Sequence, residues 1–325
     1  MADPKVQILS FDALAGWADD DHSAAFQVFL NTCGDMKSPD WKSLCAVAKD
    51  QTDPRSFFEL LFRPVLIEDG KPGLFTGYFE PELNGSLTKT SRFSHPVYGM
   101  PQEAKDIRPW LPRRELIESG VLTDRDLEIA WVDDPVELFF LQIQGSGRVR
   151  LSNGRAIRVG YAGANGQPYR SIGKELIDQG VLKPHQASAE SIKSWVRNNP
   201  EAGKELLYKN PSYVFFREVS HVPAHLGPLG AMNRSITTMR TVAIDPAYIP
   251  LGAPVWIEKE GRDPLSRLMI AQDTGSAIKG SQRADIFFGT GDEAGRLAGQ
   301  IKDPGRLVVL LPIQQAYAML PEGAS

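Results

Sequence analysis

Two aspartates, Asp273 and Asp285, stand where they could carry out acid–base chemistry. Asp273 follows an apolar run at 268–270, Asp285 precedes another at 286–288, and a loop rich in Gly and Ser joins them. A carboxyl group among apolar neighbours loses hydration, and a second carboxylate nearby disfavours its charge further, so its pKa rises. A carboxylic acid that stays protonated near neutral pH can donate a proton to a leaving oxygen.

A purely structural explanation of these aspartates is open on the residues alone. Asp is common in Gly-rich turns, so Asp273 could cap the loop and Asp285 could hold a turn. Other catalytic motifs are missing from the sequence: there is no phosphate loop, and 145–147 does not match GxSxG. His221 and His225 do not form an HExxH motif, and we expect no metal or organic cofactor.

Composition places the chain among ordinary globular proteins. It has 325 residues, 42% hydrophobic and 23% charged, which is enough for two compact domains. The formal net charge of -4 argues against a nucleic-acid partner. No run approaches the roughly 18–20 apolar residues that cross a bilayer. The start, Met1 to Pro4, lacks a signal-peptide pattern, so the native protein is cytoplasmic or a leader was removed.

The expected elements are mainly strands with flanking helices. Helical spacing covers 11–61, and Asp53-Pro54 is typical of a helix start. Asn153-Gly154 between alternating apolar positions predicts a hairpin. In the middle section we expect helices at 113–118, 124–129, 171–179 and 188–198, and strands at 136–143, 149–151, 157–161 and 213–218. Later strands are expected at 241–244, 254–258, 267–272, 285–288 and 306–311, with a helix at 292–301.

Two smaller patterns carry structural expectations. Gly291, Gly295 and Gly299 repeat every four residues in a segment that also holds charged residues, which predicts a soluble helix packed closely on a strand. Cys33 and Cys45 lie in two short helices that meet at 34–39. They are either small buried hydrophobes or a disulfide across a helical hairpin.

Several segments resemble the membrane-bound lytic murein transglycosylase A (MltA) family, whose catalytic piece is the three-aspartate (3D) domain. Spaced at appropriate intervals, they cover roughly residues 60 to 312. The three aspartates would be Asp245, Asp273 and Asp285. The matching segments are TVAIDP from 241, IPLG from 249, DTG from 273, AIKG from 277, ADIF from 284, and upstream FTGYFEP from 75, FLQIQGSG from 140, GYAGANGQPY from 160 and NPSYVFF from 210.

The resemblance implies a split fold. Residues 1–97 together with 240–325 would form a double-psi β-barrel catalytic domain, with a helical N-terminal extension at about 11–62. Residues 98–239 would form an inserted β-rich substrate-binding domain, with the glycan in the cleft where the two domains meet. The family also implies a periplasmic protein, associated with the outer membrane through a leader that this chain does not contain.

The resemblance also assigns roles. Asp285 would be the acid and then the base, Asp273 would orient it and raise its pKa, Asp245 would support the site, and Lys279 would offset developing negative charge. Sugar rings and acetamido groups need flat apolar faces, amides and hydroxyls. The expected substrate-binding residues are Thr76, Gly77, Tyr78, Glu80, Gln142, Gln144, Gly145, Ser146, Tyr161, Asn165 and Tyr169.

The function implied is cleavage of the β-1,4 bond between N-acetylmuramic acid and N-acetylglucosamine in peptidoglycan, with a 1,6-anhydro product, by a monomer. Two alternatives stay open. A β-1,4-glycan hydrolase would use Asp273 and Asp285 as a pair to add water. A non-catalytic module would bind wall glycan without turnover, although an Asp with apolar neighbours is costly for binding alone.

Overall fold

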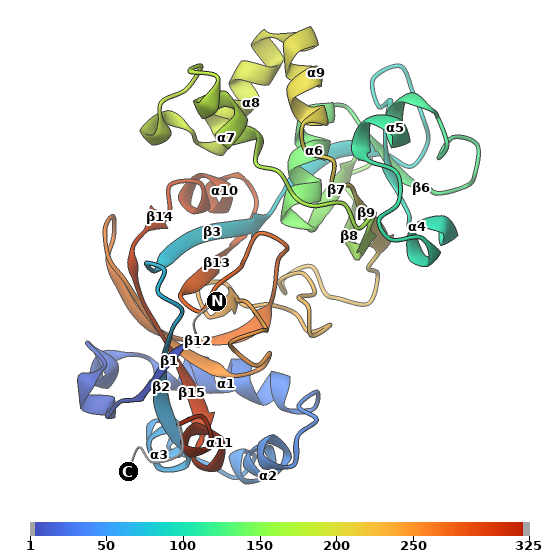
Figure 1. Cartoon of the computed structure of the whole chain (residues 1–325). Helices are drawn as coiled ribbons and strands as arrows, with labels where there is room; N and C mark the ends of the chain where they lie inside the picture. Colours follow the sequence, from blue (N-terminus) through green and yellow to red (C-terminus); the bar gives the residue numbers. More distant parts are fainter. Residues whose placement is uncertain (1–3, 321–325) are drawn as a thin grey trace. The chain divides into compact units, whose positions relative to one another are not determined.

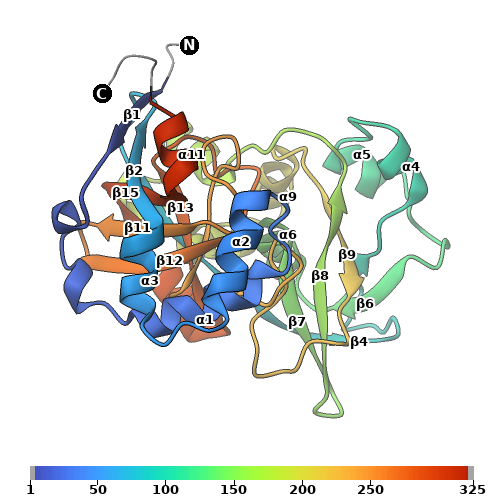
Figure 2. The same cartoon turned by 90° about the horizontal axis from the view of Figure 1, so that it is seen from below.

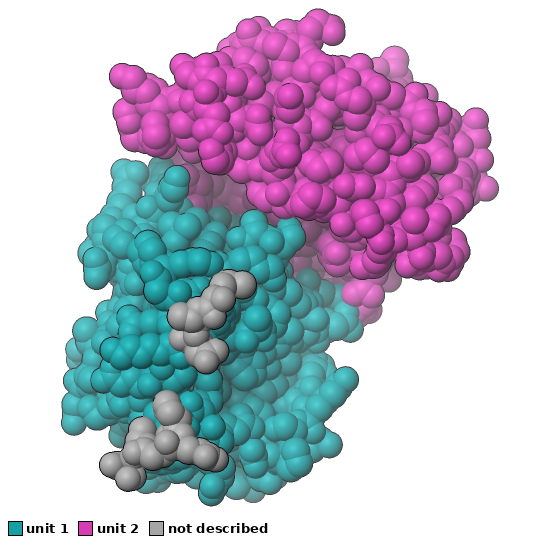
Figure 3. Space-filling view, in the orientation of Figure 1, with its two compact units in different colours: residues 1–78, 229–289, 300–325 teal, residues 79–228, 290–299 magenta. Residues whose placement is uncertain are grey.

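The computed structural model describes residues 4–320, which form two compact units (Figures 1 and 3). The first unit comprises Met1–Tyr78, Leu229–Gly289 and Gln300–Ser325, and the second comprises Phe79–Pro228 and Thr290–Gly299. The sequence-based division differs from these units at three places: residues 79–97 and 290–299 lie in the second unit, and residues 229–239 lie in the first. In the second unit, β4 (Glu82–Ser86) and β5 (His95–Tyr98) both pair with β6 (Glu128–Val132). The leader-like pattern sought at Met1–Asp3 falls outside the described residues.

The first unit is built on a nine-stranded sheet of order β1-β2-β15-β11-β12-β10-β13-β3-β14. Most neighbours are antiparallel, but β10 pairs with β12 in parallel. Strands widely separated in sequence lie side by side, so the sheet requires both ends of the chain. Its strands are β1 (Lys5–Ile8), β2 (Phe62–Glu68), β3 (Leu74–Glu80), β10 (Thr241–Ala243), β11 (Pro254–Lys259), β12 (Leu265–Asp273), β13 (Arg283–Thr290), β14 (Lys302–Asp303) and β15 (Gly305–Pro312).

Helices α1 (His22–Cys33), α2 (Pro39–Ala48), α3 (Pro54–Leu61) and α11 (Ile313–Ala318) flank this sheet (Figure 2). Asp53 caps α3 by accepting from Ser56 N, as the Asp-Pro pair predicts. Phe29, Phe58 and Phe62 are almost fully buried against one another, forming an aromatic core beneath the sheet. Cys33 and Cys45 form a disulfide that joins α1 to α2.

The second unit contains a six-stranded sheet of order β5-β6-β4-β7-β8-β9. The predicted hairpin around Asn153-Gly154 is confirmed: β7 and β8 pair antiparallel on either side of it. The strands are β4 (Glu82–Ser86), β5 (His95–Tyr98), β6 (Glu128–Val132), β7 (Ser146–Leu151), β8 (Ala156–Ala164) and β9 (Val214–Glu218). The helices are α4 (Gln102–Asp106), α5 (Arg113–Glu118), α6 (Pro135–Gln144), α7 (Ile172–Asp178), α8 (Ala189–Asn198), α9 (Pro200–Tyr208) and α10 (Asp292–Ala298).

Two element predictions for this unit were wrong. Residues 136–143, expected as a strand, form α6, because Asp134 caps the helix through Val136 N and Glu137 N and Gly145 ends it at φ 80°. Residues 124–129, expected as a helix, form turns followed by β6, since Asp124 and Asp126 take left-handed backbone angles of φ 57° and 53°.

The prediction for the glycine repeat holds at Gly295. A Cβ there would lie 2.7 Å from the ring of Phe79 on β3, so any larger residue would force that ring to move away from α10. The fold as a whole is mainly β with flanking helices, as expected; closure as a double-psi barrel stays a prediction. No helix within residues 4–320 combines the length and the apolar character needed to span a bilayer.

Candidate active site

The two aspartates lie on two strands of the first unit, Asp273 on β12 and Asp285 on β13. β10 lies between β12 and β13, and its residue Ala243 is the register partner of both Asp273 and Asp285. The Cα atoms of the two aspartates are therefore two strand spacings apart, about 10 Å. On the other side of β13, Thr76 and Tyr78 on β3 are two residues apart and so project from one face of that strand. The sheet brings all four side chains into one group.

Asp285 is held through one of its two oxygens. Its Oδ1 accepts a hydrogen bond of 2.5 Å from Thr76 Oγ1, and Thr76 in turn accepts one of 2.8 Å from Arg283 Nη2. Its Oδ2 has no hydrogen-bond partner among the described residues. The carboxyl group is only partly buried, so this second oxygen can exchange a proton with a bound molecule.

Asp273 is held through both oxygens. Oδ1 accepts from Ala231 N at 3.0 Å and Thr274 N at 2.9 Å, while Oδ2 accepts from the Tyr78 hydroxyl at 2.9 Å. Burial, followed by the charge of Asp273, raises the pKa of Tyr78 well above its ordinary value, so Tyr78 stays a donor. Three donors on one carboxylate fix its position and leave it little freedom to transfer a proton elsewhere.

Both aspartates have raised pKa values, and burial is the main cause in each. Burial raises the pKa of Asp273 to about 6, against its hydrogen bonds, with a smaller contribution from the charge of Asp285. Burial also raises the pKa of Asp285, while the Thr76 hydrogen bond and the Arg283 charge act in the opposite direction. The site therefore keeps carboxyl groups protonated at higher pH than water would.

The third aspartate of the motif, Asp245, holds a loop. Its Oδ2 accepts from Gly280 N at 2.9 Å, and its Oδ1 lies 3.5 Å from Lys279 Nζ. Gly280 has φ 118°, which few other residues adopt, so the turn depends on it. The Lys279 side chain is 61% exposed and keeps its ammonium group accessible to solvent and ligands. Asp245 thus supports the loop between β12 and β13.

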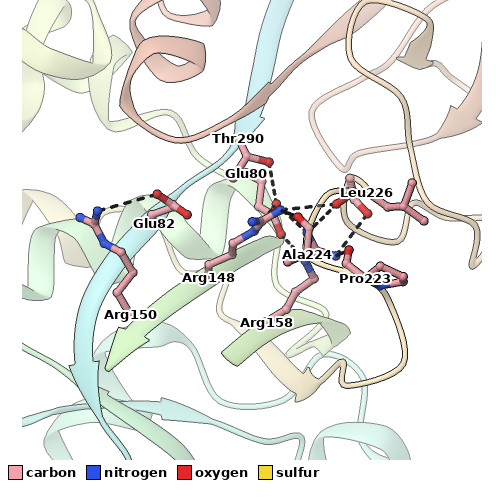
Figure 4. A network of polar contacts seen from close by, with 10 residues as sticks. Glu80, Glu82, Arg148, Arg150, Arg158, Pro223, Ala224, Leu226 and Thr290 are labelled. Atoms are coloured by element: carbon pink, nitrogen blue, oxygen red, sulfur yellow. Dashed lines mark hydrogen bonds and ion pairs between the residues drawn. The ribbon is translucent and has the colours of Figure 1, made fainter. Parts of the chain in front are cut away.

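The predicted substrate residue Glu80 has a different environment, in the second unit (Figure 4). Its side chain is 0% exposed. Oε1 accepts from Arg158 Nε at 2.7 Å, and Oε2 accepts from Arg148 Nε at 2.9 Å and Thr290 Oγ1 at 2.7 Å. Both oxygens of Glu80 accept hydrogen bonds from protein donors, which gives this residue a structural role. A contact between Glu80 and sugar stays a prediction.

Asn165, another predicted substrate residue, is likewise occupied by protein partners. It is fully buried, with Nδ2 donating to Leu111 O and Pro211 O and Oδ1 accepting from Tyr213 N. Its amide therefore has no group left for a sugar.

The other predicted substrate residues of the second unit vary in accessibility. Gln142 and Ser146 are buried, and Gln144 Oε1 accepts from Phe79 N. Gly145 ends α6. Tyr161 is 54% exposed, and Tyr169 is partly buried. Of this set, the Tyr161 ring is the most available surface for stacking on a sugar. In the first unit, Gly77 lies between Thr76 and Tyr78 on β3.

Sequence reasoning missed Arg283. It lies two residues before Asp285 on β13 and therefore on the same face of the strand. A cation two residues before a candidate acid in the same strand was the pattern from which the sequence could have indicated Arg283. In the part of the chain that the structure describes, no three His, Cys, Asp or Glu side chains gather in a way that could hold a metal ion.

Comparisons with known proteins match both parts of the chain. Residues 74–217 match the MltA specific insert domain, and residues 240–311 match the 3D domain. A 3D domain combined with this insert, and carrying partly buried carboxyl groups on the strands either side of β10, defines the class of murein lytic transglycosylases.

Individual relatives narrow this class. The chain is 35% identical to "Membrane-bound lytic murein transglycosylase A" of Vibrio cholerae over 264 aligned residues. The alignment covers 77% of this chain and 69% of the relative. A crystal structure of a membrane-bound lytic murein transglycosylase from Agrobacterium tumefaciens matches with a TM-score of 0.87 and 31% identity, covering 97% and 99% of the two chains. Escherichia coli MltA with bound chitohexaose matches with a TM-score of 0.76 and 29% identity, covering 94% of each chain. The chain belongs to the membrane-bound lytic murein transglycosylase A family and is a peptidoglycan lytic transglycosylase.

Proposed function

We propose that Asp285 is the single acid–base catalyst with which this enzyme cleaves peptidoglycan glycan strands. The observation that carries the proposal is the asymmetry of its carboxyl group. Thr76 holds Oδ1, whereas Oδ2 has no partner among residues 4–320, and burial raises the pKa of the group. A protonated acid with one fixed and one available oxygen suits proton donation to a glycosidic oxygen.

The reaction needs one carboxyl group and no water. Asp285 protonates the oxygen that joins C1 of N-acetylmuramic acid to N-acetylglucosamine, and the C1–O bond breaks. The resulting carboxylate then removes the proton from the C6 hydroxyl of the same muramic residue as that oxygen bonds to C1. A 1,6-anhydro ring forms. Intramolecular attack is favoured because the nucleophile is already positioned, which avoids the entropic cost of recruiting a second molecule.

The neighbouring residues would assist Asp285 in different ways. Asp273 is fixed by three donors, so we assign it to the electrostatics of the site, where its charge and that of Asp285 disfavour one another and the pKa of Asp273 is raised in part by the charge of Asp285. Lys279 lies on the loop that Asp245 holds and offers an accessible cation to the lactyl or peptide carboxylate of the substrate. Arg283 orients Thr76 and, through it, Asp285.

Two features of the relatives support the substrate and the location. The Escherichia coli relative was crystallised with chitohexaose, a β-1,4-linked hexasaccharide, and we propose that this chain likewise binds a β-1,4 glycan strand. The relatives' names describe them as membrane-bound, and we propose a periplasmic location at the outer membrane. We propose that the protein acts as a monomer.

Mass spectrometry of soluble fragments from purified peptidoglycan tests the proposal. The protein should release 1,6-anhydromuropeptides, and Asp285→Asn should lower the rate by about 10²–10⁴-fold, the usual contribution of acid–base catalysis. Asp178→Asn, on an exposed helical face, serves as the matched control and should keep full activity. Fragments heavier by one water would replace the proposal with hydrolysis. An active Asp285→Asn variant would remove Asp285 as the catalyst.

A further inference from the structure

A cavity of about 640 Å³ lies within the second unit, apart from the Asp273–Asp285 site. Its volume falls within the range of small-molecule sites in proteins, roughly 300–1,000 Å³. The lining is mostly apolar and includes Leu116, Leu138, Val136 and Phe139 from α5 and α6. No step of the proposed cleavage reaction takes place in this cavity, although Gln142, one of the expected substrate-binding residues, also lines it.

One buried cation, Arg113 on α5, lines the cavity. Its side chain is buried, and its guanidinium lies 4.5 Å from the Phe139 ring centre and 5.2 Å from that of Tyr213. Nε donates to Asn210 O at 3.0 Å and Nη2 donates to Ser212 O. These contacts hold the guanidinium plane in place, so the position of its charge is fixed before any ligand arrives.

No carboxylate neutralises this cation. Arg113 forms no ion pair with any of the described residues, and its Nη1 has no hydrogen-bond partner among them. Burial lowers the pKa of Arg113 to about 10, so the group remains charged at neutral pH. A buried charge without a counter-ion is costly, and the usual solution in proteins is an opposite charge within hydrogen-bonding distance.

The other charged groups along the wall do not supply that partner. Asp134, a lining carboxylate, caps α6 and accepts from Arg197 Nη2 at 2.8 Å. Lys204, also in the lining, lies 5.7 Å from the ring centre of Tyr208 and adds positive charge. The cavity thus combines apolar walls with an excess of positive charge, and the buried part of that charge is Arg113.

We infer that this cavity binds a small amphipathic carboxylate, with its apolar body against the walls and its carboxylate paired with Arg113. Arg favours this class of ligand because a planar guanidinium can form two parallel hydrogen bonds with a carboxylate. A neutral molecule of the same shape would gain the apolar contacts but would leave Arg113 unpaired. The inference therefore predicts that the cavity binds a carboxylic acid more tightly than the corresponding amide.

Calorimetric titration of the full chain with 2-naphthoate and with the isosteric, uncharged 2-naphthamide tests the inference. The carboxylate should bind at least about tenfold more tightly, because only the carboxylate can form charged hydrogen bonds with Arg113. Equal affinities, or no binding of either compound, would overturn the inference. Peptidoglycan cleavage is measured separately, so failure here leaves the proposed reaction untouched.

A variant at the cavity wall localises the site. Arg113→Gln would leave buried carbonyl groups without their donor, so we choose Ile117→Glu, at a lining residue that is 49% exposed and tolerates a charge. It should weaken 2-naphthoate binding several-fold and leave 2-naphthamide binding unchanged. The matched control is Ile107→Glu, at an isoleucine that is 53% exposed and lies outside the lining; it should change neither affinity. An equal effect of the two variants would overturn the assignment to this cavity.

Discussion

Two acidic groups, Glu80 and Asp285, lie at least partly out of water but have opposite surroundings. Glu80 is fully buried and accepts from two arginines and a threonine, which neutralise its charge and use both of its oxygens. Asp285 is held by one neutral hydroxyl on one oxygen. Its nearest cation, Arg283, donates to Thr76 and reaches the aspartate only indirectly.

Under the proposed function, the difference separates a structural carboxylate, Glu80, from a reactive one, Asp285. Paired arginines stabilise the charged form of a buried acid and leave it nothing further to bind. A neutral donor on one oxygen positions the acid while burial continues to favour the protonated form. Both carboxyl groups are at least partly buried, so burial alone does not distinguish the two roles. The charge and the number of their hydrogen-bond donors distinguish them.

Removal of the charge on Glu80 should have the largest effect on stability. Glu80→Gln leaves Arg148 and Arg158 without a counter-ion, and breaking a buried ion pair costs about 3–5 kcal/mol. Chemical denaturation followed by tryptophan fluorescence measures the free energy of unfolding. Glu82→Gln, whose partner Arg150 is half exposed, is the matched control and should lose no more than about 1 kcal/mol. If both variants lose the same amount, the Glu80 network is no more than a surface ion pair.

The unfolding free energy should show the cost of burying Asp273. In the folded protein its pKa is raised from 3.8 to about 6, so the unfolded chain releases this proton first as the pH rises. The wild type should therefore lose roughly 2–3 kcal/mol relative to Asp273→Asn between pH 4 and pH 7. Denaturation curves of both proteins across that pH range show whether the stability difference changes in this direction. A difference that does not vary with pH would contradict a raised pKa.

Thr76→Val should have a smaller effect, on the pH profile of cleavage. The Thr76 hydroxyl lowers the pKa of Asp285, so its removal should raise that pKa by up to about one unit, the equivalent of one hydrogen bond. In the proposed mechanism the acid form of Asp285 performs the first step, so activity should fall as the pH rises through this pKa. The alkaline limb of kcat/KM should thus move to higher pH in Thr76→Val and return in Thr76→Ser. A shift to lower pH would show that Thr76 does not stabilise the charged form.

The sequence predicted the candidate acids better than it predicted their supports. Asp273 and Asp285 were recognisable because each borders an apolar strand, a local pattern. Their common register partner, Ala243, could not be recognised from the sequence, because pairing between strands depends on contacts between residues far apart in the chain. For the same reason the sequence did not indicate the polar network around Glu80: its partners Arg148 and Thr290 lie 68 and 210 residues away.

The errors in the elements also have local causes. Residues 136–143 are apolar on several faces, and a short apolar run does not distinguish a strand from a buried helix. The capping signals beside it, Asp134-Pro135 and Gly145, favoured the helix and outweighed the β-propensity of the run. The hairpin at Asn153-Gly154 was predicted correctly because its turn residues leave few alternatives.

The position of α10 sets a limit on how this protein can be divided for expression. The insert matches a contiguous family model at 74–217, yet the compact unit also includes residues 290–299, which come from the far end of the chain. A recombinant fragment cut at 79–228 would leave Phe79 without the helix that Gly295 brings against it and Glu80 without Thr290. A soluble second unit would therefore need this ten-residue segment supplied through a linker or as a separate peptide.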